Sequence, residues 1–155
     1  MSLIIGILGR PNKMEREIYS FSKAIVDVII RYEAVPLGIM PSTINVNNKL
    51  SEKEKERLYE LINLCDGIIL QGGSDYYDYD MEAIKYINKK DIPLLGICLG
   101  MQSLAAATNG KIESDKLKDH KKPGLDYAHS VKINKDSKFY TIINKEVLNV
   151  NSIKK

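Results

Sequence analysis

Residues 94–104 read Leu-Leu-Gly-Ile-Cys-Leu-Gly-Met-Gln-Ser-Leu, and this stretch decides the fold. A short apolar run enters a Gly-x-Cys-x-Gly turn, and a helical pattern leaves it. This order predicts a nucleophile elbow, in which a strand ends, the chain turns sharply and the nucleophile lies above the carboxyl edge of a sheet. Gly96 and Gly100 suit the tight crossing of strand and helix, where any side chain would be crowded.

Cys98, at the centre of that turn, is the candidate catalytic residue. It would lie at the first turn of the following helix, where unpaired N–H groups and the positive end of the helix dipole favour negative charge on sulfur. A lone cysteine is more often a small buried apolar residue. The flanking glycines favour the nucleophile for Cys98, whereas Cys65 falls on the apolar stripe of a helix and is expected in the core.

Strand and helix patterns alternate along residues 1–110. Apolar runs of the kind found in parallel sheets predict strands at residues 3–8, 35–40, 67–70 and 93–97. Helical patterns cover residues 14–33, 51–65, a short stretch capped by Asp80, and 100–109. This alternation predicts a doubly wound α/β fold with a mostly parallel sheet. Ligands bind such sheets outside the carboxyl ends of the strands, where the Gly72-Gly73 turn and Cys98 fall.

Local signals describe these helices further. The apolar face expected for the helix over 14–33 consists of Ile18, Phe21, Ile25, Val28, Ile29 and Tyr32. Ser51 followed by Glu54 predicts a capping box at the start of the next helix. Ala105, Ala106 and Ala107 would let the elbow helix lie close to the sheet, and Asn109-Gly110 predicts its end.

The pattern changes after Gly110. Residues 111–112, 129–133 and 147–150 read as short strands with turns between them, and residues 137–143 as one or two helical turns. We therefore expect a short antiparallel part at the C-terminal end.

The composition excludes several classes of protein. The 155 residues suffice for one domain with a single core, and 44% are hydrophobic and 28% charged. The net charge of +3 comes from scattered lysines, and the run at 116–122 reads as a solvated loop, so we expect no nucleic-acid partner. No apolar run approaches the roughly 20 residues of a membrane span, so we expect no membrane partner. The two cysteines do not make a disulfide framework, which predicts a reducing, cytoplasmic location, and neither has a metal-ligand spacing, which predicts no metal.

The elbow also resembles a known family. Gly-Ile-Cys-Leu-Gly-Met-Gln at residues 96–102 is similar to the active-site signature of class I glutamine amidotransferases and their γ-glutamyl hydrolase relatives. Residues 68–75, Ile-Ile-Leu-Gln-Gly-Gly-Ser-Asp, resemble the second landmark of that family, a strand that runs into a Gly-Gly turn. The resemblance implies a flavodoxin-like fold.

The similarity is greatest to the γ-glutamyl-γ-aminobutyrate hydrolase branch, peptidase C26. Segments that resemble this branch are Ile5-Gly6-Ile7, Arg10-Pro11, residues 35–41, 109–115, 129–131 and 150–152. The resemblance implies hydrolysis of a γ-glutamyl amide, either glutamine or a γ-glutamyl amine, through a thioester on Cys98 and without a cofactor.

The same chemistry assigns the remaining site residues. The N–H groups of Leu99 and Gly73 are the expected oxyanion donors, because one follows the nucleophile and the other lies on the neighbouring turn. Gly72 and Gln102 are expected to bind the small-molecule substrate, Gln102 because it matches the family position that hydrogen-bonds the glutamyl end. As an isolated residue, Gln102 would more often be an exposed polar residue of a helix.

No histidine of this sequence matches the general base of the family. A cysteine amidase needs a histidine to accept the thiol proton and to protonate the leaving amine. In the family this histidine, closely followed by a glutamate, comes from a strand beyond the last residue here. His129 matches a non-catalytic His-x-Val strand, and His120 lies in the lysine-rich run. We therefore expect residues 1–155 to be a single, C-terminally truncated domain with little activity alone, unless a second chain in a homo-oligomer supplies the histidine.

Two other functions stay open. The chain could be a glutaminase subunit that supplies ammonia to a partner synthase. It could also be a non-catalytic protein that only binds a ligand in this pocket.

Overall fold

The computed structural model describes residues 1–13, 17–41, 48–111 and 126–150. The chain divides into two units, Met1–Ile112 and Glu113–Lys155. All five candidate site residues belong to the first unit. One domain over the whole chain stays a prediction.

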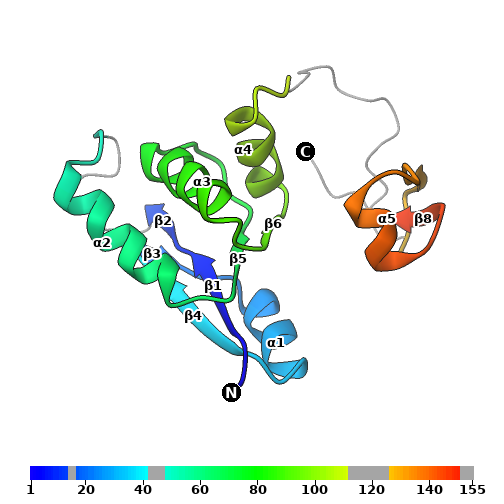
Figure 1. Cartoon of the computed structure of the whole chain (residues 1–155), viewed down its shortest axis with the longest axis horizontal. Helices are drawn as coiled ribbons and strands as arrows, with labels where there is room; N and C mark the ends of the chain where they lie inside the picture. Colours follow the sequence, from blue (N-terminus) through cyan, green and yellow to red (C-terminus); the bar gives the residue numbers. More distant parts are fainter. Residues whose placement is uncertain (14–16, 42–47, 112–125, 151–155) are drawn as a thin grey trace. The chain divides into compact units, whose positions relative to one another are not determined.

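A four-stranded parallel sheet forms the centre of the first unit, in the order β4-β1-β5-β6 (Figure 1). The strands are β1 (Ile4–Leu8), β4 (Val35–Ile39), β5 (Gly67–Leu70) and β6 (Leu94–Gly96). At the centre of the sheet, Ile5 pairs with Pro36 on one side and with Gly67 on the other. Counted along the chain, these four strands lie in the order 2-1-3-4, as in flavodoxin-like sheets. The predicted doubly wound α/β fold with a mostly parallel sheet is confirmed.

Helices lie on both faces of this sheet (Figure 1). They are α1 (Lys23–Arg31), α2 (Glu52–Asn63), α3 (Asp78–Lys90) and α4 (Leu99–Ala107). Because neighbouring residues of a strand point to opposite faces, Ile68 and Leu70 pack into the core with α2 and α3, whereas Ile69 faces α1. Fully buried side chains of this core include Leu58, Ile62, Ile84 and Ile87. Cys65, also expected in the core, is buried.

The predicted capping box begins α2. The Ser51 N–H donates to Glu54 Oε2 over 2.7 Å, and the Glu54 N–H donates to Ser51 Oγ over 3.4 Å. These two bonds satisfy donors that the first turn of a helix otherwise leaves without partners.

The single helix predicted over 14–33 is wrong. Instead, β2 (Arg10–Lys13) and β3 (Glu17–Ser20) form an antiparallel pair, and α1 begins only after Ser22. Ile18, expected on a buried helix face, is 47% exposed in β3, and Tyr32 is 79% exposed. Phe21 packs against the sheet edge instead, since a Cβ on Gly38 would lie 2.9 Å from its Cζ. The apolar spacing fitted a helix, but pairing with β2 and packing of Phe21 outweigh that periodicity.

The cap predicted at Asp80 is also wrong. The N-cap of α3 is Tyr77, three residues earlier, and the helix begins at Asp78. Asp80 lies inside the first turn, where its Oδ2 accepts the Tyr77 N–H over 3.1 Å. The carboxylate is drawn inward by a charged partner on β2, described below.

The second unit contains a small antiparallel pair, β7 (His129–Lys132) and β8 (Val147–Val150), with α5 (Lys138–Ile143) between them in sequence. These elements confirm the antiparallel part and the helical turns expected there. A strand was expected at residues 111–112. Lys111, the one described residue of this pair, is not in a strand and lies shortly after the turn that ends α4. Ile112 and the lysine-rich run at 116–122, with His120, lie outside the described residues.

The capping box gives a test of local stability. We expect Ser51→Ala to lower the free energy of unfolding by about 1 kcal/mol, because the Glu54 N–H loses its acceptor. Urea unfolding followed by circular dichroism measures this loss. Ser51→Asp retains a capping oxygen and should unfold at nearly the wild-type urea concentration. Equal losses in both variants would contradict a capping role.

Candidate active site

A strained residue joins β6 to α4. Cys98 has φ 55° and ψ −111°, in a region of backbone space that residues other than glycine rarely occupy. Hydrogen bonds on both sides hold this turn: the Ile97 N–H donates to the Leu70 carbonyl over 2.9 Å, and the Gln102 N–H to the Cys98 carbonyl over 3.1 Å. The Cys98 side chain is exposed at the carboxyl edge of the sheet. The structure therefore has the backbone geometry of the predicted nucleophile elbow.

Two glycines allow the helix to approach the sheet this closely. A Cβ on Gly100 would lie 2.1 Å from the Leu70 carbonyl oxygen, and a Cβ on Gly96 would lie 2.6 Å from the Gly100 carbonyl carbon. Real Cβ atoms are not found at such distances from backbone atoms. The close crossing thus depends on these glycines. Of the three predicted alanines, Ala107 packs against the core, whereas Ala106 is exposed.

The Gly72-Gly73 turn lies beside the elbow, at the end of β5. A Cβ on Gly72 would lie 3.4 Å from Cys98 Cβ and 3.9 Å from Cys98 Sγ. A Cβ on Gly73 would lie 3.1 Å from Leu99 Cδ2. The structure therefore brings together four residues that the sequence placed in the site, namely Cys98, Leu99, Gly72 and Gly73.

Gln102, the fifth expected site residue, lies one helical turn after Cys98 and is half-buried. Its Oε1 accepts a hydrogen bond from Tyr76 Oη over 3.3 Å. Tyr76 lies in the loop between the Gly-Gly turn and α3, and no periodic pattern in the sequence indicated this contact. Because Tyr76 binds the amide oxygen, the Gln102 NH₂ group is the part of the amide left to donate elsewhere.

A buried amide anchors the Gly-Gly turn. Gln71 Nε2 donates to the Leu8 and Ser20 carbonyls, each over 2.9 Å. Its Oε1 accepts the Ser22 N–H over 2.8 Å, at the start of α1. One side chain thus ties the end of β5 to β1, β3 and α1. The only sequence signal was a polar residue between a buried strand and two glycines.

A buried ion pair lies behind the same turn. Arg10 Nη1 and Asp80 Oδ2 are 2.6 Å apart, and the two residues are 5% and 0% exposed. Burial raises the pKa of the Asp80 carboxyl, and the adjacent Arg10 guanidinium opposes that shift. Sequence reasoning missed this pair, because its members are 70 residues apart.

The other cysteine is in a different environment. Cys65 is 8% exposed, and its Sγ donates to the Leu61 carbonyl over 3.5 Å. Burial raises the pKa of the Cys65 thiol, and the nearby Asp66 carboxylate raises it further. Cys65 is therefore unsuited to act as a nucleophile.

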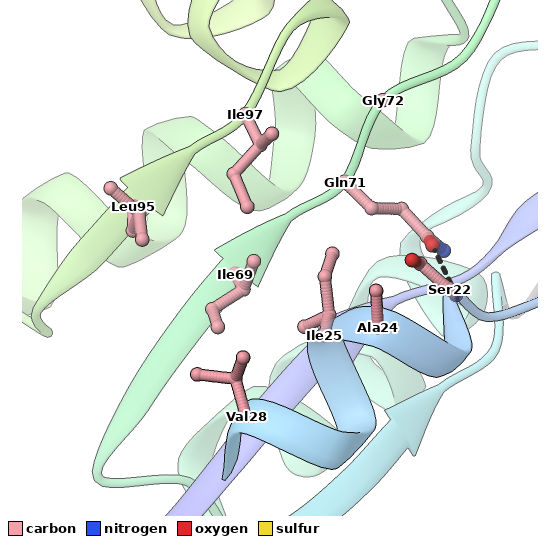
Figure 2. A pocket seen from close by; sticks show the side chains of 9 residues that line it. All are labelled: Ser22, Ala24, Ile25, Val28, Ile69, Gln71, Gly72, Leu95 and Ile97. Atoms are coloured by element: carbon pink, nitrogen blue, oxygen red, sulfur yellow. Dashed lines mark hydrogen bonds between the residues drawn. The ribbon is translucent and has the colours of Figure 1, made fainter. Parts of the chain in front are cut away.

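An apolar cavity of about 510 Å³ adjoins the site on the α1 face of the sheet (Figure 2). Gly72 and Ile97 belong to its lining, and Ile97 directly precedes Cys98. The other lining residues are Ser22, Ala24, Ile25, Val28, Ile69, Gln71 and Leu95. These side chains are mostly aliphatic and none is titratable, so the cavity offers apolar contacts but no proton-transfer group.

Histidine is not among residues 1–112, and the two histidines of the chain are His120 and His129. His129 begins β7 in the second unit.

Within the described ranges, no group of three or more His, Cys, Asp or Glu residues could hold a metal ion. None of the described helices has the length and hydropathy of a membrane span.

The elbow gives a test of the close crossing. We expect Gly100→Ala to lower the free energy of unfolding by about 3 kcal/mol through overpacking, despite the ~1 kcal/mol that alanine ordinarily adds in a helix. Urea unfolding measures this change. Ala106→Ser, at an exposed position of the same helix, is the control and should change stability by less than about 0.5 kcal/mol. Wild-type stability of Gly100→Ala would contradict the claim that α4 crosses β5 with no room for a Cβ at residue 100.

Comparison with known proteins places this geometry in a family. A CTP synthase of Methanocaldococcus jannaschii is 33% identical over 109 residues, in a match that covers 63% of this chain and 18% of that protein. One of the subunits of a glutamine-hydrolyzing GMP synthase, from Methanothrix thermoacetophila, is 43% identical over 54 residues, 35% of this chain and 29% of the relative. A glutamine-hydrolyzing GMP synthase of Legionella pneumophila is 36% identical over 63 residues, 39% of this chain and 12% of that protein.

The chain spans less than a third of the length of each of these relatives. The family described as glutamine amidotransferase class-I matches residues 17–151, a range that includes the Gly-Gly turn, the elbow and α4. Since this match covers well over half of the sequence, the chain belongs to the glutamine amidotransferase class-I family.

Proposed function

We propose that this chain cleaves γ-glutamyl amides through a thioester on Cys98. The observation that carries the proposal is the exposed, strained Cys98 beside the Gly72-Gly73 turn. The Cys98 thiolate attacks the amide carbonyl carbon, and the tetrahedral intermediate collapses as the C–N bond breaks. The amine or ammonia leaves with a proton, and water then hydrolyses the thioester to glutamate and the free thiol.

Two backbone donors would stabilise the negative oxygen of the tetrahedral intermediate. The Leu99 N–H belongs to the first residue of α4, where a helix has no internal acceptor for it. The Gly73 N–H lies on the turn that touches Leu99. Donors of this kind are most effective when they are fixed before the reaction, since no energy is then spent on reorientation.

Gln102 and Gly72 would hold the glutamyl end of the substrate. The Tyr76 hydrogen bond to Gln102 Oε1 supports this role, because it orients the NH₂ group as a donor for a substrate oxygen. Gly72 has no side chain and lies against Cys98, so the substrate backbone can approach the sulfur closely.

A proton acceptor for the Cys98 thiol has to come from outside residues 1–112 if it is a histidine. We propose that neither His120 nor His129 takes this role and that a second chain supplies the histidine. A cytoplasmic, reducing location would keep the nucleophile as a free thiol.

Within the family, the branch decides which amide is cleaved. The segments that resemble γ-glutamyl-γ-aminobutyrate hydrolases favour a γ-glutamyl amine as the substrate. A second candidate is a glutaminase part that delivers ammonia to a synthase, and the CTP and GMP synthase relatives favour it. The two candidates share the thioester step and differ in the leaving group and in the need for a partner.

The thioester step can be tested without a general acid. The γ-p-nitrophenyl ester of glutamate has a leaving group that departs without being protonated. We expect one equivalent of p-nitrophenolate and a mass increase of one γ-glutamyl group on the chain. Cys98→Ala should abolish both signals, and Cys65→Ala, which alters the buried cysteine, should retain them. Acylation that persists in Cys98→Ala would refute the assignment, and a folded wild type that is never acylated would favour a non-catalytic binding protein.

Steady turnover separates the remaining alternatives. We expect the 155-residue chain alone to release little ammonia from glutamine and little amine from γ-glutamyl-γ-aminobutyrate, because neither His120 nor His129 is proposed to act as the base. Assays with and without a partner synthase measure this. Glutamine turnover that rises only with the synthase would favour the glutaminase part. Substantial turnover by the chain alone that survives substitution of both His120 and His129 by alanine would show that no histidine is required.

A further inference from the structure

A tyrosine joins the two sides of the site. Tyr76 lies in the loop between the Gly72-Gly73 turn and α3, whereas Gln102 lies on α4, one turn after Cys98. Tyr76 Oη donates to Gln102 Oε1 over 3.3 Å. This hydrogen bond therefore connects the loop that follows the glycine turn to the helix that follows the nucleophile.

Contacts on both sides of Tyr76 hold this loop in place. On one side, Gly73 lies against Leu99, the first residue of α4. On the other side, Tyr77 packs against the core, and its N–H donates to the buried Asp80 carboxylate over 3.1 Å. The helix that begins there, α3, packs beside α4 (Figure 1). Tyr76 lies between these two anchors, which limits the positions that its hydroxyl can take relative to α4.

The hydrogen bond decides which end of the Gln102 amide is available to a ligand. A hydroxyl can bind either the oxygen or the NH₂ group of an amide, and here it donates to the oxygen. The backbone of Gln102 is fixed as well, since its N–H donates to the Cys98 carbonyl over 3.1 Å. The terminal torsion of a glutamine side chain is otherwise only weakly restricted. The Tyr76 hydroxyl supplies the restriction, and the NH₂ group is left to donate to a ligand.

The glutamyl end of the proposed substrate carries a carboxylate, which accepts hydrogen bonds, and an ammonium, which donates them. An amide NH₂ group binds the carboxylate, whereas the amide oxygen in the same place would repel it. We propose that Tyr76 is a positioning residue, which holds the Gln102 amide with its NH₂ group toward the carboxylate of the substrate. The site would thereby select acyl groups that end in a hydrogen-bond acceptor. This inference rests on the thioester mechanism and on the role of Gln102 proposed above.

The test measures acylation of Cys98 in the full chain by the γ-p-nitrophenyl ester of glutamate. Tyr76→Phe removes the hydroxyl donor and keeps the ring. We expect the half-saturating ester concentration to rise roughly threefold to tenfold, on the scale of one lost hydrogen bond, because the amide then turns its oxygen toward the carboxylate part of the time. The maximal acylation rate should stay unchanged. Alkylation by iodoacetamide should also stay unchanged, as should acylation by p-nitrophenyl butyrate, whose acyl group has no carboxylate.

Two further variants test the direction of the amide. Gln102→Glu keeps an acceptor for Tyr76 and removes the NH₂ group, so it should raise the half-saturating concentration at least as far as Tyr76→Phe does. Adding Tyr76→Phe to Gln102→Glu should then cause little further change, because the hydroxyl acts through the amide. Tyr32→Phe, at a tyrosine that is 79% exposed at the end of α1, is the matched control and should match the wild type.

A Tyr76→Phe variant that melts like the wild type and keeps the wild-type half-saturating concentration would overturn the positioning role alone. A loss of maximal acylation rate or of alkylation in place of the change in half-saturation would do the same. Tighter binding of the ester by Gln102→Glu would show that the amide oxygen faces the substrate, which would also overturn the role. A wild type that is alkylated but never acylated would overturn the thioester mechanism and this role together.

Discussion

The contact between Gly100 and the Leu70 carbonyl is the constraint on which the site depends. Because α4 crosses β5 with no room for a Cβ, the chain must turn from β6 into the helix within very few residues. Cys98 takes up this turn with a positive φ of 55° and is left exposed. A strained backbone of this kind persists only where surrounding contacts hold it in place. Here the pairing of β5 with β6 holds the strand that leads into Cys98.

The other side of the site, the Gly72-Gly73 turn, depends on polar contacts between segments that are distant in the sequence. The Gly72-Gly73 turn has little structure of its own, yet the Gln71 amide ties it to three elements and Arg10 lies behind it. Buried polar groups with several satisfied bonds define one arrangement more strictly than apolar packing does. The elbow at Cys98 is thus fixed by close backbone packing, and the neighbouring Gly72-Gly73 turn is fixed by polar contacts.

This division accords with the chemistry proposed for the chain. A thioester mechanism needs a nucleophile at a fixed position and donors directed at an oxygen that becomes charged only in the transition state. The glutamine amidotransferase class-I family is shown by the match over residues 17–151. The leaving group and the need for a partner synthase are the features on which the two proposed functions differ.

The sequence by itself determined the parallel strands, the Ser51 capping box and the elbow around Cys98, because each depends on residues close together in the chain. It failed over 14–33, where helical spacing of apolar residues competed with pairing between β2 and β3. Only the tertiary structure decided that Asp80 turns inward to Arg10 and that Gln71 binds segments up to 63 residues away. The physical reason is that such partners are chosen by the packing of the sheet and its helices, which no local pattern of residues records.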